Sequence, residues 1–153
     1  DKIAPAQEHF ISLLIRQKLS TSIDQLPVND QSKNHWLLFL PENEFHESGL
    51  LMANYLLRHA GHRSTNLGAN VPLDSLIDAV QVLRPASLLL FLVKHDDEQQ
   101  DELYIQQLLQ KFPDQKIFVA TQPHRLTKLR THKNLQFVDS LAQFKQILST
   151  NPI

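Results

Sequence analysis

The chain has 153 residues, of which 42% are hydrophobic and 20% are charged, and these proportions suit one folded domain of average size. Its formal net charge of −1 excludes the basic excess of a nucleic-acid-binding module, and the absence of cysteine excludes disulfides and thiolate metal sites. Apolar runs stay short of the roughly 20 residues that span a membrane, and no signal-peptide pattern occurs. We therefore expect a cytoplasmic protein without a membrane partner.

The first predicted element is a helix from Ile3 to Leu19, in which apolar residues such as Phe10 and Leu14 recur at helical spacing. The helix has two apolar flanks, so we expect it to pack on partners outside this chain or on a second copy. The polar residues from Ser20 to Asn34 are typical of a linker. For the domain division we assign residues 1–24 to a terminal helix, 25–34 to a linker and 35–153 to one α/β domain.

Five short apolar or β-branched runs alternate with helical patterns over the rest of the chain. The predicted strands are residues 36–40, 63–67, 87–93, 116–120 and 136–138, and the predicted helices are residues 46–60, 72–83, 97–112, 124–130 and 140–148. This alternation predicts a flavodoxin-like parallel sheet in the strand order 2-1-3-4-5, with helices on both faces. The strand at 87–93 is the most hydrophobic and should lie in the centre.

The run from Pro41 to Gly49 follows the first predicted strand, at the edge of the sheet where such folds bind ligands. Glu44 and His46 are two residues apart and point to the same side of an extended loop. Glu44 can then accept a hydrogen bond from one ring nitrogen of His46 and leave the other nitrogen for a metal. Gly49 would let a bulky group approach the backbone. A lone histidine also fits a plain helix start, and the run by itself leaves both interpretations open.

Two separated motifs resemble one known family. The run Glu44-x-His46-x-x-Gly49 resembles the Asp-x-His-x-x-Gly signature of cobalamin-binding domains, and the residues after it resemble the same region of MerR-type transcriptional regulators. The helix that contains Glu8 and His9 resembles the end of the helical bundle that covers the upper corrin face in those regulators. Residues 1–24 would then be the terminal helix of a helical cap.

The resemblance implies a cobalamin held between this helix and the sheet. His46 would be the lower ligand of the cobalt and Glu44 would orient it, while Glu8 and His9 would lie over the upper face and Gly49 beside the cofactor. The implied function is a non-catalytic ligand-sensing and oligomerisation domain of a MerR-family regulator. We expect a homo-oligomer that binds DNA only through a module outside this chain. The sequence contains no nucleophile elbow, phosphate-binding glycine loop or metalloprotease pair, so we expect no enzyme.

Three positions depart from the family pattern. Phe91 stands where a small hydroxyl residue usually lines the slot for the nucleotide tail of cobalamin, and Thr121 stands where a Gly-Gly pair is usual. Glu44 replaces an aspartate and is longer by one methylene. A phenyl ring at position 91 would fill much of the slot. Two alternatives therefore stay open, namely an interaction domain that has lost cobalamin and a corrinoid carrier subunit of a methyltransferase.

The other histidines and charged clusters have simpler interpretations. His59 and His62 flank a predicted helix end, where a structural role is expected. The run from His95 to Asp97 is more typical of a helix cap than of a metal or phosphoryl site. The basic stretch from His124 to Lys133 is interpreted as a solvated helix face, with an interaction surface as the alternative.

Overall fold

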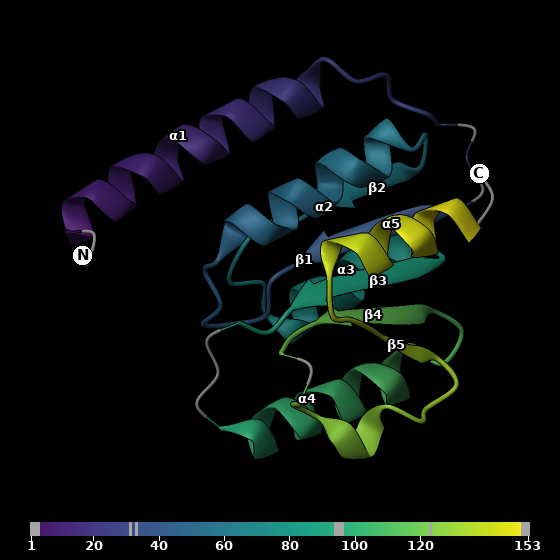
Figure 1. Ribbon diagram of the computed structural model, residues 1–153. Helices are drawn as coiled ribbons and strands as arrows, with labels where there is room; N and C mark the ends of the chain where they lie inside the picture. The colour runs from purple at the N-terminus through teal and green to yellow at the C-terminus, as the bar shows by residue number, and fades with distance from the viewer. Residues whose placement is uncertain (1–3, 31, 33, 94–96, 123, 151–153) are drawn as a thin grey trace.

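A parallel five-stranded sheet forms the centre of the molecule (Figure 1). The computed structural model describes residues 4–30, 32, 34–93, 97–122 and 124–150. The strands are β1 His35–Phe39, β2 Arg63–Asn66, β3 Ser87–Phe91, β4 Lys116–Ala120 and β5 Leu135–Val138. They lie in the order β2-β1-β3-β4-β5, and every neighbouring pair is parallel. The predicted fold class, strand order and central third strand are confirmed.

Five α-helices and one 3₁₀ turn accompany the strands in the described part of the chain, with α1 before β1 and α5 after β5. They are α1 Pro5–Asp24, α2 Glu47–His59, α3 Leu73–Leu83, α4 Glu98–Lys111, η1 Thr127–Leu129 and α5 Leu141–Thr150. Two of the helix ends follow signals in the sequence. Gly61 follows α2 with a φ of 82°, a left-handed conformation that suits glycine, and the Asp97 carboxylate caps α4 by accepting hydrogen bonds from the backbone N–H groups of Gln99 and Gln100.

The two faces of the sheet have separate cores, because successive side chains of a strand point to opposite faces. Trp36 and Leu38 of β1 belong to the core under α2 and α5, whereas Leu37 and Phe39 belong to the core under α3 and α4. This explains the continuous apolar runs of the strands, since a parallel sheet covered on both faces has no polar side. The helix residues that complete the first core are Leu50, Ala53, Leu57, Phe144, Ile147 and Leu148, and those of the second core include Leu76, Val80, Ile105 and Leu108.

Two predicted elements differ from the structure. The first helix does not end at Leu19, as its apolar pattern predicts, but continues to Asp24, because Ile23 is buried and the Thr21 hydroxyl donates a hydrogen bond to the Gln17 carbonyl. The helix predicted at 124–130 is reduced to the 3₁₀ turn η1. Leu126 is fully buried with a φ of 54°, and this left-handed conformation stops an α-helix from forming before η1.

The helix α1 lies along the outer side of α2, away from the sheet (Figure 1). The segment after α1 is tied to the end of α2 by two hydrogen bonds, from Arg58 Nη2 to the Leu26 carbonyl at 2.6 Å and from Asn29 Nδ2 to the Gly61 carbonyl at 2.7 Å. Within the described ranges, none of the helices combines the length and apolar character that crossing a bilayer requires.

Candidate functional site

A buried carboxylate holds the ring of His46 at the carboxyl edge of the sheet. The Glu44 side chain is fully buried, and its Oε1 accepts a hydrogen bond from His46 Nδ1 at 2.5 Å. The same oxygen accepts the backbone N–H groups of Phe45 at 2.9 Å and His46 at 3.1 Å. The His46 side chain is about half exposed, and it immediately precedes α2. In the neutral tautomer that donates this bond, Nδ1 carries the proton and Nε2 keeps a lone pair available for a ligand.

The loop between β1 and α2 is braced by the neighbouring loop between β2 and α3. Asn43 has a φ of 66°, a left-handed conformation that asparagine tolerates better than most residues, and its N–H donates to Asn70 Oδ1 at 2.9 Å. In return, the Asn70 N–H donates to the Glu44 carbonyl at 3.2 Å. These bonds fix the backbone on both sides of Glu44. The Glu44 side chain, which orients the ring of His46, therefore starts from a fixed position.

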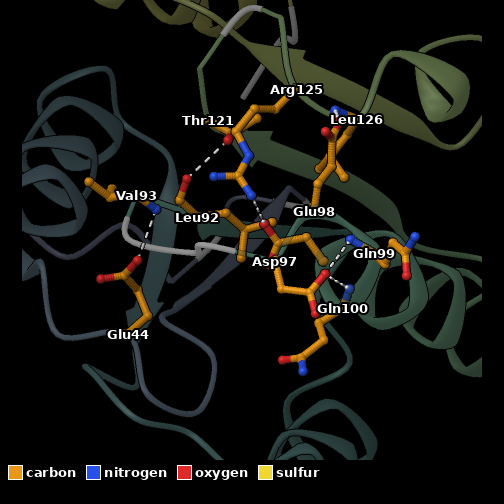
Figure 2. A network of polar contacts seen from close by, with 11 residues as sticks. Glu44, Leu92, Val93, Asp97, Glu98, Gln99, Gln100, Thr121, Arg125 and Leu126 are labelled. Carbon is orange, nitrogen blue, oxygen red and sulfur yellow. Dashed lines mark hydrogen bonds and ion pairs between the residues drawn. The ribbon is translucent and has the colours of Figure 1, made fainter.

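The other oxygen of Glu44 reaches the end of β3. Glu44 Oε2 accepts the Val93 N–H at 2.8 Å, and Figure 2 shows this bond beside a second one, in which the Thr121 hydroxyl donates to the Leu92 carbonyl at 3.0 Å. The Leu92 N–H also donates to the Ala120 carbonyl at 2.9 Å. The segment after β3 is thus held from both sides, and one carboxylate joins it to His46. Sequence reasoning missed this link, although the pairing of β1 with β3 made their ends neighbours.

An apolar pocket of about 360 Å³ lies between α2 and α5 over β3 and β4. Its walls include Gly49, Met52, Leu89, Phe91, Thr121 and Phe144. This volume is in the range of small-molecule sites. Phe91, the residue expected to fill the nucleotide slot, forms one wall of this pocket and leaves it open beside the ring. That this pocket is the nucleotide slot stays a prediction.

The bulky group that approaches Gly49 is a side chain of the protein itself. A Cβ built on Gly49 would lie 2.8 Å from Phe91 Cε1 and 3.0 Å from Cδ1, so the ring rests on the backbone of the first turn of α2. The predicted need for glycine at this position is therefore explained by packing against β3. A direct role of Gly49 toward a cofactor stays a prediction.

The amino-terminal half of α1 projects beyond the start of α2 on the side of the carboxyl edge (Figure 1). Arg16 Nη1 donates to Glu47 Oε2 at 3.2 Å, which aligns Arg16 with the first turn of α2. His9, Ser12, Arg16 and Ile23 share one helix face, since they follow a spacing of three, four and seven residues. At 1.5 Å per residue, Glu8 lies about 12 Å further out than Arg16. His9 thus extends past α2 on the face of α1 that contacts it, and Glu8 directly precedes His9.

The outer face of α1 is apolar and exposed. Phe10 has 62% of its surface exposed, Leu13 57% and Ile15 46%. The expectation that the sheet alone does not bury the apolar residues of this helix is confirmed for the described residues. That they pack on a partner or on a second copy of the chain stays a prediction. Around the carboxyl edge a second group of exposed apolar side chains consists of Phe45, Met52, Val93 and Leu141.

The remaining charged clusters are structural. Of the run from His95 to Asp97, only Asp97 belongs to the described residues, and it caps α4 as predicted. His62 is buried, with its ring beside that of Trp36, so its role is in the core. Among the described residues no group of three or more His, Asp or Glu side chains forms a metal site.

The basic stretch is not a freely solvated face. Arg125 Nη2 lies 2.8 Å from Oδ2 of the buried Asp101, and Arg130 forms two 3.0 Å hydrogen bonds to the Asp139 carboxylate. The Arg130 guanidinium also lies 4.3 Å from the centre of the Phe137 ring. Lys128 Nζ also lies 3.5 Å from Glu102 Oε1. Three of the positive charges in this stretch are therefore paired within the fold, which argues against the predicted solvated face as a description of the whole stretch.

Two transcriptional repressors of Myxococcus xanthus are similar to this chain in sequence. The HTH-type transcriptional repressor CarH is 42% identical over 80 residues, which cover 52% of this chain and 26% of the repressor. The HTH-type transcriptional repressor CarA is 37% identical over 92 residues, which cover 58% of this chain and 31% of the repressor. The chain thus matches about a quarter to a third of the length of these relatives. No family model matches the chain.

Several solved structures share the fold. The monomethylamine corrinoid protein of Methanosarcina barkeri has a TM-score of 0.72 at 13% identity, with 97% of this chain and 73% of that chain covered. A cobalamin-binding protein from Desulfitobacterium hafniense has a TM-score of 0.61 at 18% identity over 76% of this chain and 58% of its own. The methanol:cobalamin methyltransferase complex MtaBC from Methanosarcina barkeri has a TM-score of 0.64 at 18% identity over 78% and 46%. Together with the two repressors, these matches confirm the predicted resemblance to the cobalamin-binding domains of MerR-type regulators.

Proposed function

We propose that this chain is the ligand-sensing domain of a MerR-type transcriptional regulator and that it binds cobalamin at the carboxyl edge of its sheet. The observation that carries the proposal is the hydrogen bond from His46 Nδ1 to the buried Glu44. A carboxylate that holds one imidazole nitrogen fixes the tautomer and presents the other nitrogen to a metal. His46 would occupy the lower axial position, and Glu44 would orient it.

The donor set fits a corrinoid better than a free metal ion. A zinc ion takes several protein ligands, whereas His46 is a single one and the described residues hold no larger ligand cluster. A corrin holds its cobalt through its own ring nitrogens, so one imidazole is sufficient. The bound cofactor would supply a metal centre whose axial ligands can change, which is the kind of event that a ligand-responsive regulator detects.

The position of α1 supports a ligand that lies between this helix and the sheet. The overhanging residues of α1 include Glu8 and His9, and the carboxyl edge of the sheet domain exposes Phe45 and Met52. A flat macrocycle with an apolar ring and polar edges suits a space between an apolar rim and a polar helix face. We therefore propose that Glu8 and His9 contact the upper side of the ring and that Gly49 lies near its lower side.

A regulator is favoured over a corrinoid carrier because the chain is similar to the repressors in sequence and to the corrinoid proteins only in fold. The two repressors are related in sequence at 42% and 37% identity, whereas the corrinoid proteins at 13% and 18% identity share only the fold. We propose that DNA binding belongs to a module outside this chain and that the intact regulator is a cytoplasmic homo-oligomer. The same similarity supports a non-catalytic role.

The test is to mix the purified protein with hydroxocobalamin, remove free cofactor by desalting and record the visible spectrum. We expect the wild type to retain a corrinoid spectrum and His46→Ala to lose it. His59→Ala is the matched control, because His59 is an exposed histidine at the far end of α2. A desalted wild-type protein without any corrinoid absorbance would reject the proposal. Loss of the spectrum in both variants would reject the assignment of His46 as the ligand.

A further inference from the structure

We propose that Phe91 sets the corrinoid specificity of this domain and favours corrinoids that lack the nucleotide tail over complete cobalamin. This inference rests on the proposed function, because it concerns the same site. Cobalamin carries below its ring a nucleotide that ends in a benzimidazole base, and a histidine that takes the lower position displaces that base. The displaced tail needs a place close to His46.

The pocket between α2 and α5 lies close to His46, and its lining suits only one part of the tail. Gly49, which lies three residues after His46, forms part of its wall. The described wall residues include no Lys or Arg that would offset the charge of a phosphodiester, and the Asp139 carboxylate is already paired with Arg130. The hydroxyl of Thr121 already donates to the Leu92 carbonyl, and that of Ser140 accepts the Gln143 N–H. The pocket is therefore suited to an apolar group, such as the benzimidazole base, and poorly suited to the sugar phosphate that links this base to the ring.

Phe91 covers the surface of α2 that a phosphate would otherwise approach. Backbone N–H groups in the first turn of a helix are the groups that commonly bind phosphate. In this chain the Phe91 ring rests on Gly49 in the first turn of α2, within the van der Waals distance of any added Cβ. A tail that enters the pocket along α2 would have to displace this ring.

The backbone that carries Phe91 has little room to move aside. The two residues after it are held by the hydrogen bonds from Val93 N–H to Glu44 and from the Thr121 hydroxyl to the Leu92 carbonyl (Figure 2). Phe91 itself pairs with Ala120 of β4. Relief is left to rotation of the side chain into the pocket, and a ring in that position would occupy space that the tail needs. In either position the ring competes with the tail.

The test compares two probes that differ in the tail, hydroxocobalamin and diaquocobinamide, in visible spectral titrations of wild type and Phe91→Ala. We expect the wild type to bind cobinamide at least about tenfold more tightly than cobalamin. Phe91→Ala should narrow this gap by about tenfold, through tighter binding of cobalamin, while the affinity for cobinamide changes by less than about twofold.

Controls separate specificity from folding. Phe91→Leu keeps an apolar side chain and should narrow the gap by less than Phe91→Ala, which provides a second variant if the alanine protein unfolds. Leu103→Ala removes an exposed apolar side chain of α4 that does not line the pocket, and it should change neither affinity. Equal binding of both probes by the wild type, with no effect of either Phe91 variant, would overturn this inference and leave the proposed function standing. Binding of neither probe would overturn both.

Discussion

The ring of Phe91 lies directly on the backbone of Gly49, and a Cβ at position 49 would be only 2.8 Å from Phe91 Cε1. Gly49 belongs to the first turn of α2, and Phe91 is the last residue of β3. The contact therefore joins the start of the helix that follows His46 to the end of the central strand. Together with the Glu44 carboxylate, it couples the geometry of His46 to β3.

The first prediction concerns Gly49→Ala. Alanine favours a helix by up to about 1 kcal/mol over glycine, but overpacking typically costs about 1–3 kcal/mol. We expect a net loss of about 1 kcal/mol in the free energy of unfolding, measured by urea denaturation. In a Phe91→Leu background the same substitution should cost less or become stabilising. If Gly49→Ala were more stable than the wild type, the contact would not be as tight as the structure indicates.

The second prediction concerns Glu44→Gln. The amide has the same shape, but one of its ends is an N–H₂ donor that would face backbone or imidazole N–H groups now bonded to carboxylate oxygens. We expect a loss of about 2 kcal/mol in the free energy of unfolding, since a buried donor is left without an acceptor. Glu42→Gln is the matched control at an exposed glutamate of the same loop, and its effect should stay within about 0.5 kcal/mol. Equal stability of both variants would contradict this account of Glu44.

The third prediction concerns the buried ion pair between Arg125 and Asp101. Arg125→Ala removes the guanidinium and leaves the Asp101 carboxylate in a site that is 1% exposed. We expect a loss of about 3 kcal/mol in the free energy of unfolding, as is usual when one partner of a buried pair is removed. Lys128→Ala removes a lysine of the same stretch whose side chain is 80% exposed, so its 3.5 Å ion pair with Glu102 is screened by solvent and its loss should be nearly neutral. A similar small effect of both variants would show that the stretch is a solvated face.

The fourth prediction concerns the pH dependence of stability. Burial, and to a smaller extent the charge of Arg63, lowers the pKa of His35 below its ordinary value of 6.5. The unfolded state then binds more protons than the folded state between the lowered pKa and about pH 6.5, so stability falls as the pH drops through this window. Urea unfolding at about pH 7.5 and about pH 5.5 measures the difference.

The matching substitution for the pH effect is His35→Gln, which removes the titrating group. We expect it to reduce the loss of stability between the two pH values, whereas His124→Gln, at an exposed histidine, should leave that loss unchanged. If the dependence on pH were the same in all three proteins, another group would be responsible.

Local patterns in the sequence were sufficient for most of the fold. The alternation of apolar runs with helical patterns determined the order of the strands, because parallel strands joined by right-handed crossovers allow few arrangements. The contact between Glu44 and His46 was also predictable, since two residues that are two apart in a loop remain neighbours in any fold. Errors occurred where tertiary contacts decide the local conformation, as at Ile23, which extends α1, and at Leu126, which interrupts a helical pattern.

Only the tertiary structure decided how the site is built around His46. The second bond of Glu44 reaches Val93, a residue 49 positions away, and the group that approaches Gly49 is the ring of Phe91. Neither contact has a signal in the local pattern, because side chains from separate strands and helices meet only after the sheet has formed. The sequence by itself determined that a histidine with its carboxylate stands at the carboxyl edge. The packing of β3 against α2 decided that the pocket beside it remains open but has a phenyl ring as one wall.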